Sequence, residues 1–126
     1  MIKGFSHVQL VVRDIDASAT WYGVVLGLQE FTRGSFDGGE YVGLRSPTGR
    51  FVVGLQTTPA ANTDASGAPM INHLSFAVEN LADLEQHRTD IVAAGIAAGA
   101  VFEEAASWNA RFCDPDGLVV ELTAPK

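Results

Sequence analysis

The sequence predicts an α+β protein made of two βαβββ modules, whose strands form a curled mixed sheet around a central cavity. Two alternating, β-rich segments, residues 5–12 (FSHVQLVV) and 71–78 (INHLSFAV), each place a histidine third. A helical pattern follows each segment, and each half closes with a similar strand, residues 52–55 (VVGL) and 119–122 (VVEL). Because neither half can cover its sheet face alone, the repeat indicates two units joined around a shared cavity.

The first half is predicted to run strand, helix, strand, strand, strand. Its helix begins after Asp14 or Asp16, either of which can cap it, and ends at Gly27. Two further strands are expected near residues 28–33 and 40–45, before the closing strand.

The second half is predicted to repeat that order. Asn80 can cap its helix, and Gly95 suits the left-handed position that ends it. Two strands are expected near residues 100–104 and 109–113, and a turn at 114–117 (DPDG) precedes the closing strand.

The chain is predicted to be one domain of 126 residues, with module 1 at about residues 1–58, a linker at 59–69 and module 2 at 70–126. A net charge of −7 and a pI of about 4.7 argue against nucleic acid and anionic membrane as partners, because an acidic surface repels both. A single cysteine, no signal-peptide pattern and no apolar run of the ~18 residues that a membrane span needs predict a cytoplasmic protein.

Strand alternation sorts the side chains of the first and last strand of each half into two faces. One face of each strand is uniformly apolar and is expected to pack under a helix. The opposite, mixed face is expected to line the cavity. Four equivalent positions on the mixed faces hold His7, His73, Glu121 and Gly54, and Gln56 stands one step beyond Gly54.

Two imidazoles and a carboxylate from different strands form a donor set that suits a divalent first-row metal with open coordination positions. A single histidine in a strand is more often a structural residue, and Glu121 in an apolar strand could be a surface charge. The repeat-equivalent positions of His7 and His73, with Glu121 at the matching terminal position, favour a metal site over that alternative.

The repeat, the paired histidines and the segment 114–122 (DPDGLVVEL) resemble the glyoxalase / bleomycin-resistance / dioxygenase group, the vicinal oxygen chelate superfamily. The resemblance covers essentially the whole chain. It implies a bound divalent ion that is chelated by two vicinal oxygens of the substrate. The ion could be iron, manganese, nickel, zinc or cobalt. By position it implies that His7, His73 and Glu121 are the metal ligands, with Glu121 also the candidate catalytic residue.

The sequence departs from one branch of that family at Gly54. Glyoxalase I enzymes carry a glutamate there as ligand and base, and a glycine cannot move a proton. Gln56 could ligate through its amide oxygen, but it would be a poor general base. A lyase or isomerase and a ring-cleaving dioxygenase both stay open, while the fosfomycin-modifying transferases are disfavoured because Arg111 has few cationic neighbours.

Four residues are the candidate substrate contacts: Gln56, Arg111, Trp108 and Tyr41. Arg111 could meet a carboxylate or another anion, with a salt bridge to the abundant acids as the alternative. Residues 103–109 (EEAASWN) are expected to form a loop at the cavity mouth, from which Trp108 could stack on a flat ligand. Tyr41 is a candidate acid or substrate contact, with a packed tyrosine as the alternative.

Two classes of function compete. The first is a divalent-metal-dependent lyase, isomerase or dioxygenase that acts on a small oxygenated substrate. The second is a metal-free protein that sequesters an aromatic or cationic drug, as bleomycin-resistance members do, and the net charge of −7 suits a cationic ligand. A metal-free member would be expected to have a hydrophobic residue in place of one histidine. The presence of both His7 and His73 therefore favours the enzyme. The resemblance also implies a homodimer, and open sheet edges make self-pairing reasonable.

Overall fold

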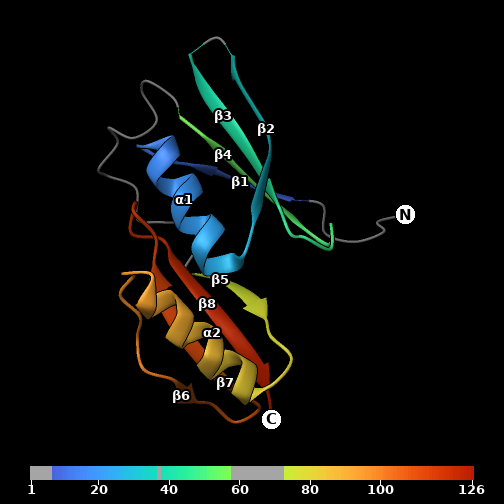
Figure 1. Ribbon diagram of the computed structural model, residues 1–126, viewed down its shortest axis with the longest axis vertical. Coiled ribbons are helices and arrows are strands. Elements are labelled where there is room, and N and C mark those ends of the chain that lie inside the picture. The colour runs from blue at the N-terminus through green and yellow to red at the C-terminus, as the bar shows by residue number, and fades with distance from the viewer. Residues whose placement is uncertain (1–6, 37, 58–72) are drawn as a thin grey trace. The chain divides into compact units, whose positions relative to one another are not determined.

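The computed structural model describes residues 7–36, 38–57 and 73–126, and it shows an α+β protein (Figure 1). The described strands form two four-stranded mixed sheets, each accompanied by one helix. The predicted fold class and the two βαβββ modules are confirmed. The chain divides into two compact units, Met1–Ala68 and Pro69–Lys126. The predicted linker, residues 59–69, lies outside the described residues.

Unit 1 holds five elements, and its strand order is β1-β4-β3-β2. The edge strand β1 pairs with β4 in parallel, and the other pairs are antiparallel. Helix α1 packs on β2, β3 and β4 (Figure 1). The elements are β1 (His7–Val11), α1 (Ile15–Leu26), β2 (Gln29–Phe36), β3 (Gly39–Arg45) and β4 (Val52–Gln56).

Unit 2 repeats this arrangement, with strand order β5-β8-β7-β6. Strands β5 and β8 are parallel, as β1 and β4 are in unit 1, and the remaining pairs are antiparallel. Helix α2 packs on β7 and β8. The elements are β5 (His73–Ala77), α2 (Leu81–Ala93), β6 (Phe102–Glu103), β7 (Ser107–Cys113) and β8 (Val119–Pro125).

Local sequence signals set the helix ends as predicted. Of the two candidate caps for α1, Asp14 is the one used: its carboxylate accepts a hydrogen bond from the Ala17 amide at 3.0 Å. The Asn80 side chain accepts from the Asp83 amide at 2.9 Å and caps α2 in the same way. Each helix ends before a glycine with positive φ, 66° at Gly27 and 88° at Gly95, a conformation that side chains with a Cβ rarely adopt.

Each helix and the sheet face beneath it enclose an apolar core. Alternate residues of the strands point into it, as the period of two requires. These side chains are at most 2% exposed, which removes nearly all of their apolar surface from water. They are Val12, Tyr22, Val25, Val42, Leu44, Val53 and Leu55 in unit 1, and Leu84, Ile91, Ala110, Phe112, Val120, Leu122 and Ala124 in unit 2.

No helix among the described residues is long and apolar enough to cross a membrane.

Candidate functional site

The site in unit 2 lies on the sheet face opposite α2. Val120 and Leu122 of β8 are buried on the helix side, so Glu121 between them points to the other face. The strand register places Ser75 of β5 and Arg111 of β7 directly beside Glu121. His73 precedes Ser75 by two residues and therefore shares its face.

The Glu121 carboxylate is held by neighbours on three strands. Its Oε2 accepts a hydrogen bond from Arg111 Nε at 2.8 Å, and its Oε1 lies 3.7 Å from His73 Nε2. Thr123 Oγ1 donates to Oε1 at 3.2 Å, and the Thr123 and Ser75 hydroxyls are 2.7 Å apart. Glu121 is only 6% exposed. A buried carboxylate with this many partners is fixed in orientation.

These neighbours lower the pKa of Glu121 below its ordinary value of 4.5. Burial by itself raises the pKa, because it disfavours the charged form. The hydrogen bond and the charge of Arg111 outweigh burial, with smaller contributions from His73 and Ser75. Glu121 is therefore ionised at neutral pH, as a metal ligand must be.

The His73–Glu121 pair combines an imidazole and a carboxylate, two side-chain types that bind first-row divalent metals. Two donor atoms that are each about 2.1 Å from an ion, at tetrahedral or octahedral angles, lie about 3.0–3.4 Å apart. The observed 3.7 Å between Nε2 and Oε1 is slightly wider than that range. Within the described residues no group of three or more histidine, cysteine or acidic side chains comes together as a complete metal site. Unit 2 therefore presents two of the three predicted ligands side by side.

In unit 1 the corresponding face carries His7. His7, Gln9 and Val11 of β1 are exposed, whereas Leu10 is buried toward α1. The register of β4 places Gln56 beside Val11, and Gln56 also pairs with Tyr41 of β3. His7, Gln56 and Tyr41 thus share one face of the unit 1 sheet.

Gln9 is the residue that the sequence reasoning overlooked. Its partner across the sheet is Gly54, the position equivalent to Glu121. A Cβ built on Gly54 would lie 2.7 Å from Gln9 Cδ and closer still to Gln9 Oε1, so the Gln9 carboxamide occupies the space above this glycine. Gln56, which the sequence offers as a candidate for that role, lies two residues further along β4, beside Val11. Strand alternation predicts that His7 and Gln9 lie on the same face of β1. It does not predict that the Gln9 carboxamide lies over Gly54 of the neighbouring strand.

The expected loop over residues 103–109 is wrong. Glu103 lies in β6 and pairs with Trp108 of β7, so most of the segment is a hairpin. Trp108 pairs with Ala124 and lies on the opposite face of the sheet from Arg111 and Glu121. Lys126 Nζ sits 5.1 Å from the centre of its ring. Trp108 and Arg111, the two candidate substrate contacts in unit 2, therefore lie on opposite faces of the sheet.

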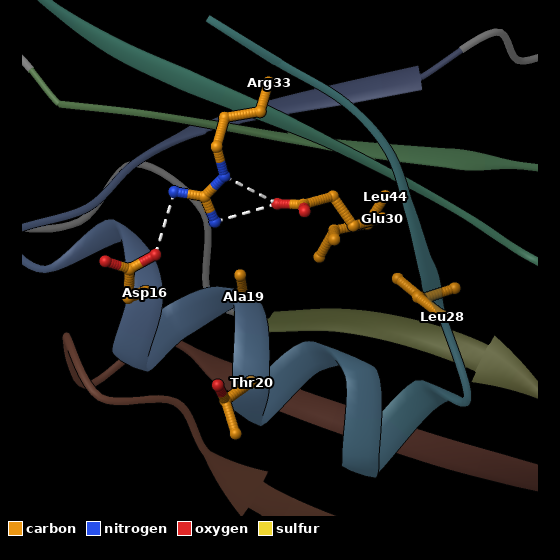
Figure 2. A pocket seen from close by; sticks show the side chains of 7 residues that line it. All are labelled: Asp16, Ala19, Thr20, Leu28, Glu30, Arg33 and Leu44. Carbon is orange, nitrogen blue, oxygen red and sulfur yellow. Dashed lines mark hydrogen bonds and ion pairs between the residues drawn. The ribbon is translucent and has the colours of Figure 1, made fainter.

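Unit 1 also holds a cavity of about 250 Å³ between α1 and the sheet (Figure 2). Arg33 reaches across it to Asp16 on α1 and to Glu30 on β2, each at 2.8 Å. Leu44, which also lines the cavity, is buried on the helix side of β3. The cavity therefore lies on the face opposite His7 and contains no predicted site residue.

Comparison with known proteins identifies the family. The family model described as "Glyoxalase/Bleomycin resistance protein/Dioxygenase superfamily" matches residues 4–122. The chain belongs to this superfamily. None of the curated proteins compared with the chain matches it.

Solved structures of the superfamily have the same fold. A glyoxylase/bleomycin resistance protein/dioxygenase domain from Frankia sp. EAN1pec is 31% identical, with a TM-score of 0.88 over 100% of this chain and 94% of that chain. The fosfomycin resistance protein FosX from Listeria monocytogenes is 17% identical, with a TM-score of 0.79 over 100% of this chain and 96% of that chain. A FosX mutant complexed with Mn(II) and 1S,2S-dihydroxypropylphosphonic acid is 18% identical, with a TM-score of 0.78 over 100% and 95% of the two chains. The resemblance read from the sequence is thus confirmed, and the superfamily fold spans the chain.

Proposed function

We propose that this chain is a divalent-metal-dependent enzyme, a lyase, isomerase or dioxygenase, that acts on a small oxygenated substrate. His7, His73 and Glu121 are the proposed ligands, with the remaining coordination positions open to substrate. The observation that carries the proposal is the His73–Glu121 pair, with Nε2 and Oε1 3.7 Å apart on one sheet face. The FosX structure with Mn(II) supports a divalent ion, because that protein shares the fold.

The chain's own groups prepare Glu121 for this role. Arg111 binds Oε2 and leaves Oε1 directed at His73, so it orients the carboxylate as well as keeping it ionised. A bound divalent ion would supply Lewis acidity toward the substrate oxygens. The Arg111 side chain is 47% exposed, so its terminal nitrogens can also meet an anionic substrate group. Gln56 and Tyr41 remain proposed substrate contacts from unit 1.

A second candidate function is metal-free sequestration of an aromatic or cationic drug. Large apolar side chains are unusually exposed on the unit 1 face that carries His7, with Phe31 at 45%, Phe36 at 41% and Tyr41 at 37%. Aromatic rings on an acidic protein suit a flat cation.

Calorimetric titration separates the two functions. The metal-stripped protein is titrated with Mn²⁺ and Zn²⁺, in parallel with His73→Ala, Glu121→Gln and the matched control His87→Ala on α2. If the chain is a metal enzyme, the wild type and His87→Ala should each bind one ion. His73→Ala and Glu121→Gln should bind none. Equal binding by all four proteins contradicts the proposal. Tight binding of bleomycin without any ion supports sequestration instead.

The proposed homodimer is tested separately by size-exclusion chromatography with light scattering, which measures the mass of the protein as it elutes. A mass twice that of the chain supports it, and the monomer mass contradicts it.

A further inference from the structure

A row of three side chains crosses the unit 2 sheet at Glu121. Ser75 of β5, Glu121 of β8 and Arg111 of β7 are register partners on the same face. The two outer residues support the carboxylate between them: Arg111 by its 2.8 Å hydrogen bond, and Ser75 by lowering the Glu121 pKa together with Arg111. The row is therefore charged, and its long central side chain comes from the last strand of the module.

The equivalent row in unit 1 has different residues at all three positions. Gln9 of β1, Gly54 of β4 and Gly43 of β3 are register partners there. The short residue now stands on the last strand and the long one on the first, so the polar side chain approaches from the opposite side. Where unit 2 has a carboxylate and a guanidinium, unit 1 has one neutral carboxamide and two glycines.

The side chain of Gln9 is exposed, and its carboxamide lies over Gly54. A Cβ on Gly54 would lie 2.7 Å from Gln9 Cδ and closer still to Gln9 Oε1, so the carboxamide would have to move to admit it. Gly54 itself is buried. The glycine thus provides the space that the carboxamide occupies, and any side chain at position 54 would displace Gln9.

We propose that Gln9 is the ligand-contacting polar residue of unit 1 and that its carboxamide, which lies over Gly54, takes the position that the Glu121 side chain has in unit 2. It follows His7 by two residues on the exposed face of β1, which puts the two side chains about 7 Å apart along the strand. The inference rests on the proposed function, since it names the partner of a ligand bound at His7. It replaces Gln56, which lies one step further along β4, beside Val11.

The chemistry of the carboxamide defines what it can bind. An amide has one acceptor oxygen and two N–H donors and carries no charge near neutral pH. It therefore fits a neutral oxygen of the ligand, such as a hydroxyl, a carbonyl or a water on a bound ion. It cannot remove a proton as a carboxylate could, so Gln9 can bind and orient a ligand but cannot act as its base.

The position of Gln9 is tested by thermal unfolding of a double-mutant cycle. Gly54→Ala alone should lower the melting temperature by about 2 °C, because the new methyl group displaces only the end of an exposed, flexible side chain. In the Gln9→Ala background, Gly54→Ala should lower the melting temperature much less, because no carboxamide then occupies the space over residue 54. Equal losses in both backgrounds overturn the proposed position of Gln9.

The ligand contact is tested by titration of Zn²⁺ alone into the metal-stripped full chain. Gln9→Ala should weaken the affinity by about tenfold, as loss of a group that supports a metal site does. The control Gln86→Ala, which removes a carboxamide from helix α2 instead, should stay within about twofold of the wild type. Equal affinities of Gln9→Ala and the wild type, or equal weakening by Gln9→Ala and Gln86→Ala, overturn the inference.

A third variant distinguishes failure of this inference from failure of the proposed function. His7→Ala should weaken Zn²⁺ binding more than Gln9→Ala does. If His7→Ala weakens binding and Gln9→Ala does not, only the role of Gln9 is overturned. If neither His7→Ala nor His73→Ala changes the affinity, the proposed metal site is overturned, and the role of Gln9 beside it is overturned as well.

Discussion

Replacement of Arg111 by alanine tests how the Glu121 carboxylate is held. The substitution removes the 2.8 Å hydrogen bond between Nε and Oε2 and leaves a carboxylate that is 6% exposed without its cation. It also removes the guanidinium that lies 5.1 Å from the centre of the Phe102 ring. Both losses destabilise the fold, but only the first depends on pH.

The magnitude follows from the unequal exposure of the two partners. Exposed ion pairs contribute up to about 1 kcal/mol, whereas removal of one partner of a fully buried pair costs about 3–5 kcal/mol. Here one side chain is 8% exposed and the other 47%. We therefore expect a loss of about 2 kcal/mol in the free energy of unfolding at pH 7, between those limits.

The pH dependence has a definite sign. In the wild type the folded pKa of Glu121 is below the ordinary 4.5, so its stabilisation is present above that pH and is lost as the pH falls through the lowered value. In Arg111→Ala, burial is no longer outweighed by Arg111 and raises the pKa instead. The difference in unfolding free energy between the two proteins should therefore be largest near neutral pH and should shrink below about pH 4.5.

Urea unfolding followed by tryptophan fluorescence, at pH 7 and at pH 4, measures this difference. Arg33→Ala is a matched control, because Arg33 binds carboxylate oxygens at the same 2.8 Å but does so on the surface. The control should lose much less stability, since its partners Asp16 and Glu30 are exposed. A loss in Arg111→Ala that equals the control, or that is the same at both pH values, refutes the reasoning.

Three further predictions test other contacts. Ser75→Ala should raise the pKa of Glu121, because the serine hydroxyl is one of the groups that lower it; an unchanged carboxyl ¹³C titration would contradict this. Phe112→Ala should cost about 3–5 kcal/mol of unfolding free energy in a urea titration, because the ring is 1% exposed; a loss below about 1 kcal/mol would show that the site collapses around the gap. Gly95→Ala should cost about 1 kcal/mol, because φ is 88° there, and no loss by the same method would mean that the end of α2 can rearrange.

Much of the fold could be predicted because its signals are local. The caps at Asp14 and Asn80 and the terminal glycines Gly27 and Gly95 act within one helical turn, and the structure uses all four as expected. Strand alternation also separated Val120 and Leu122, the apolar residues of β8 that face the helix, from Glu121 between them. These features can be predicted from a single sequence, because the backbone geometry of a helix or strand fixes the spacing at which buried apolar residues recur.

The errors arose where pairing between distant residues decides the structure. The segment 103–109 contains small and acidic residues typical of a loop, yet Glu103 pairs with Trp108 across a hairpin. The same register turns Trp108 to the face away from Glu121. No local preference specifies that register, because it depends on which strands lie side by side.

The repeated pattern, the helix ends and the acidic and imidazole candidates at His7, His73 and Glu121 were all determined by the sequence alone. Only the tertiary structure decided that Arg111 binds Glu121 and that Gln9, rather than Gln56, covers Gly54. The physical reason is that a strand's own alternation selects a face, whereas the neighbours on that face come from other strands. Those neighbours are set by hydrogen-bond register and by the space that small residues leave open.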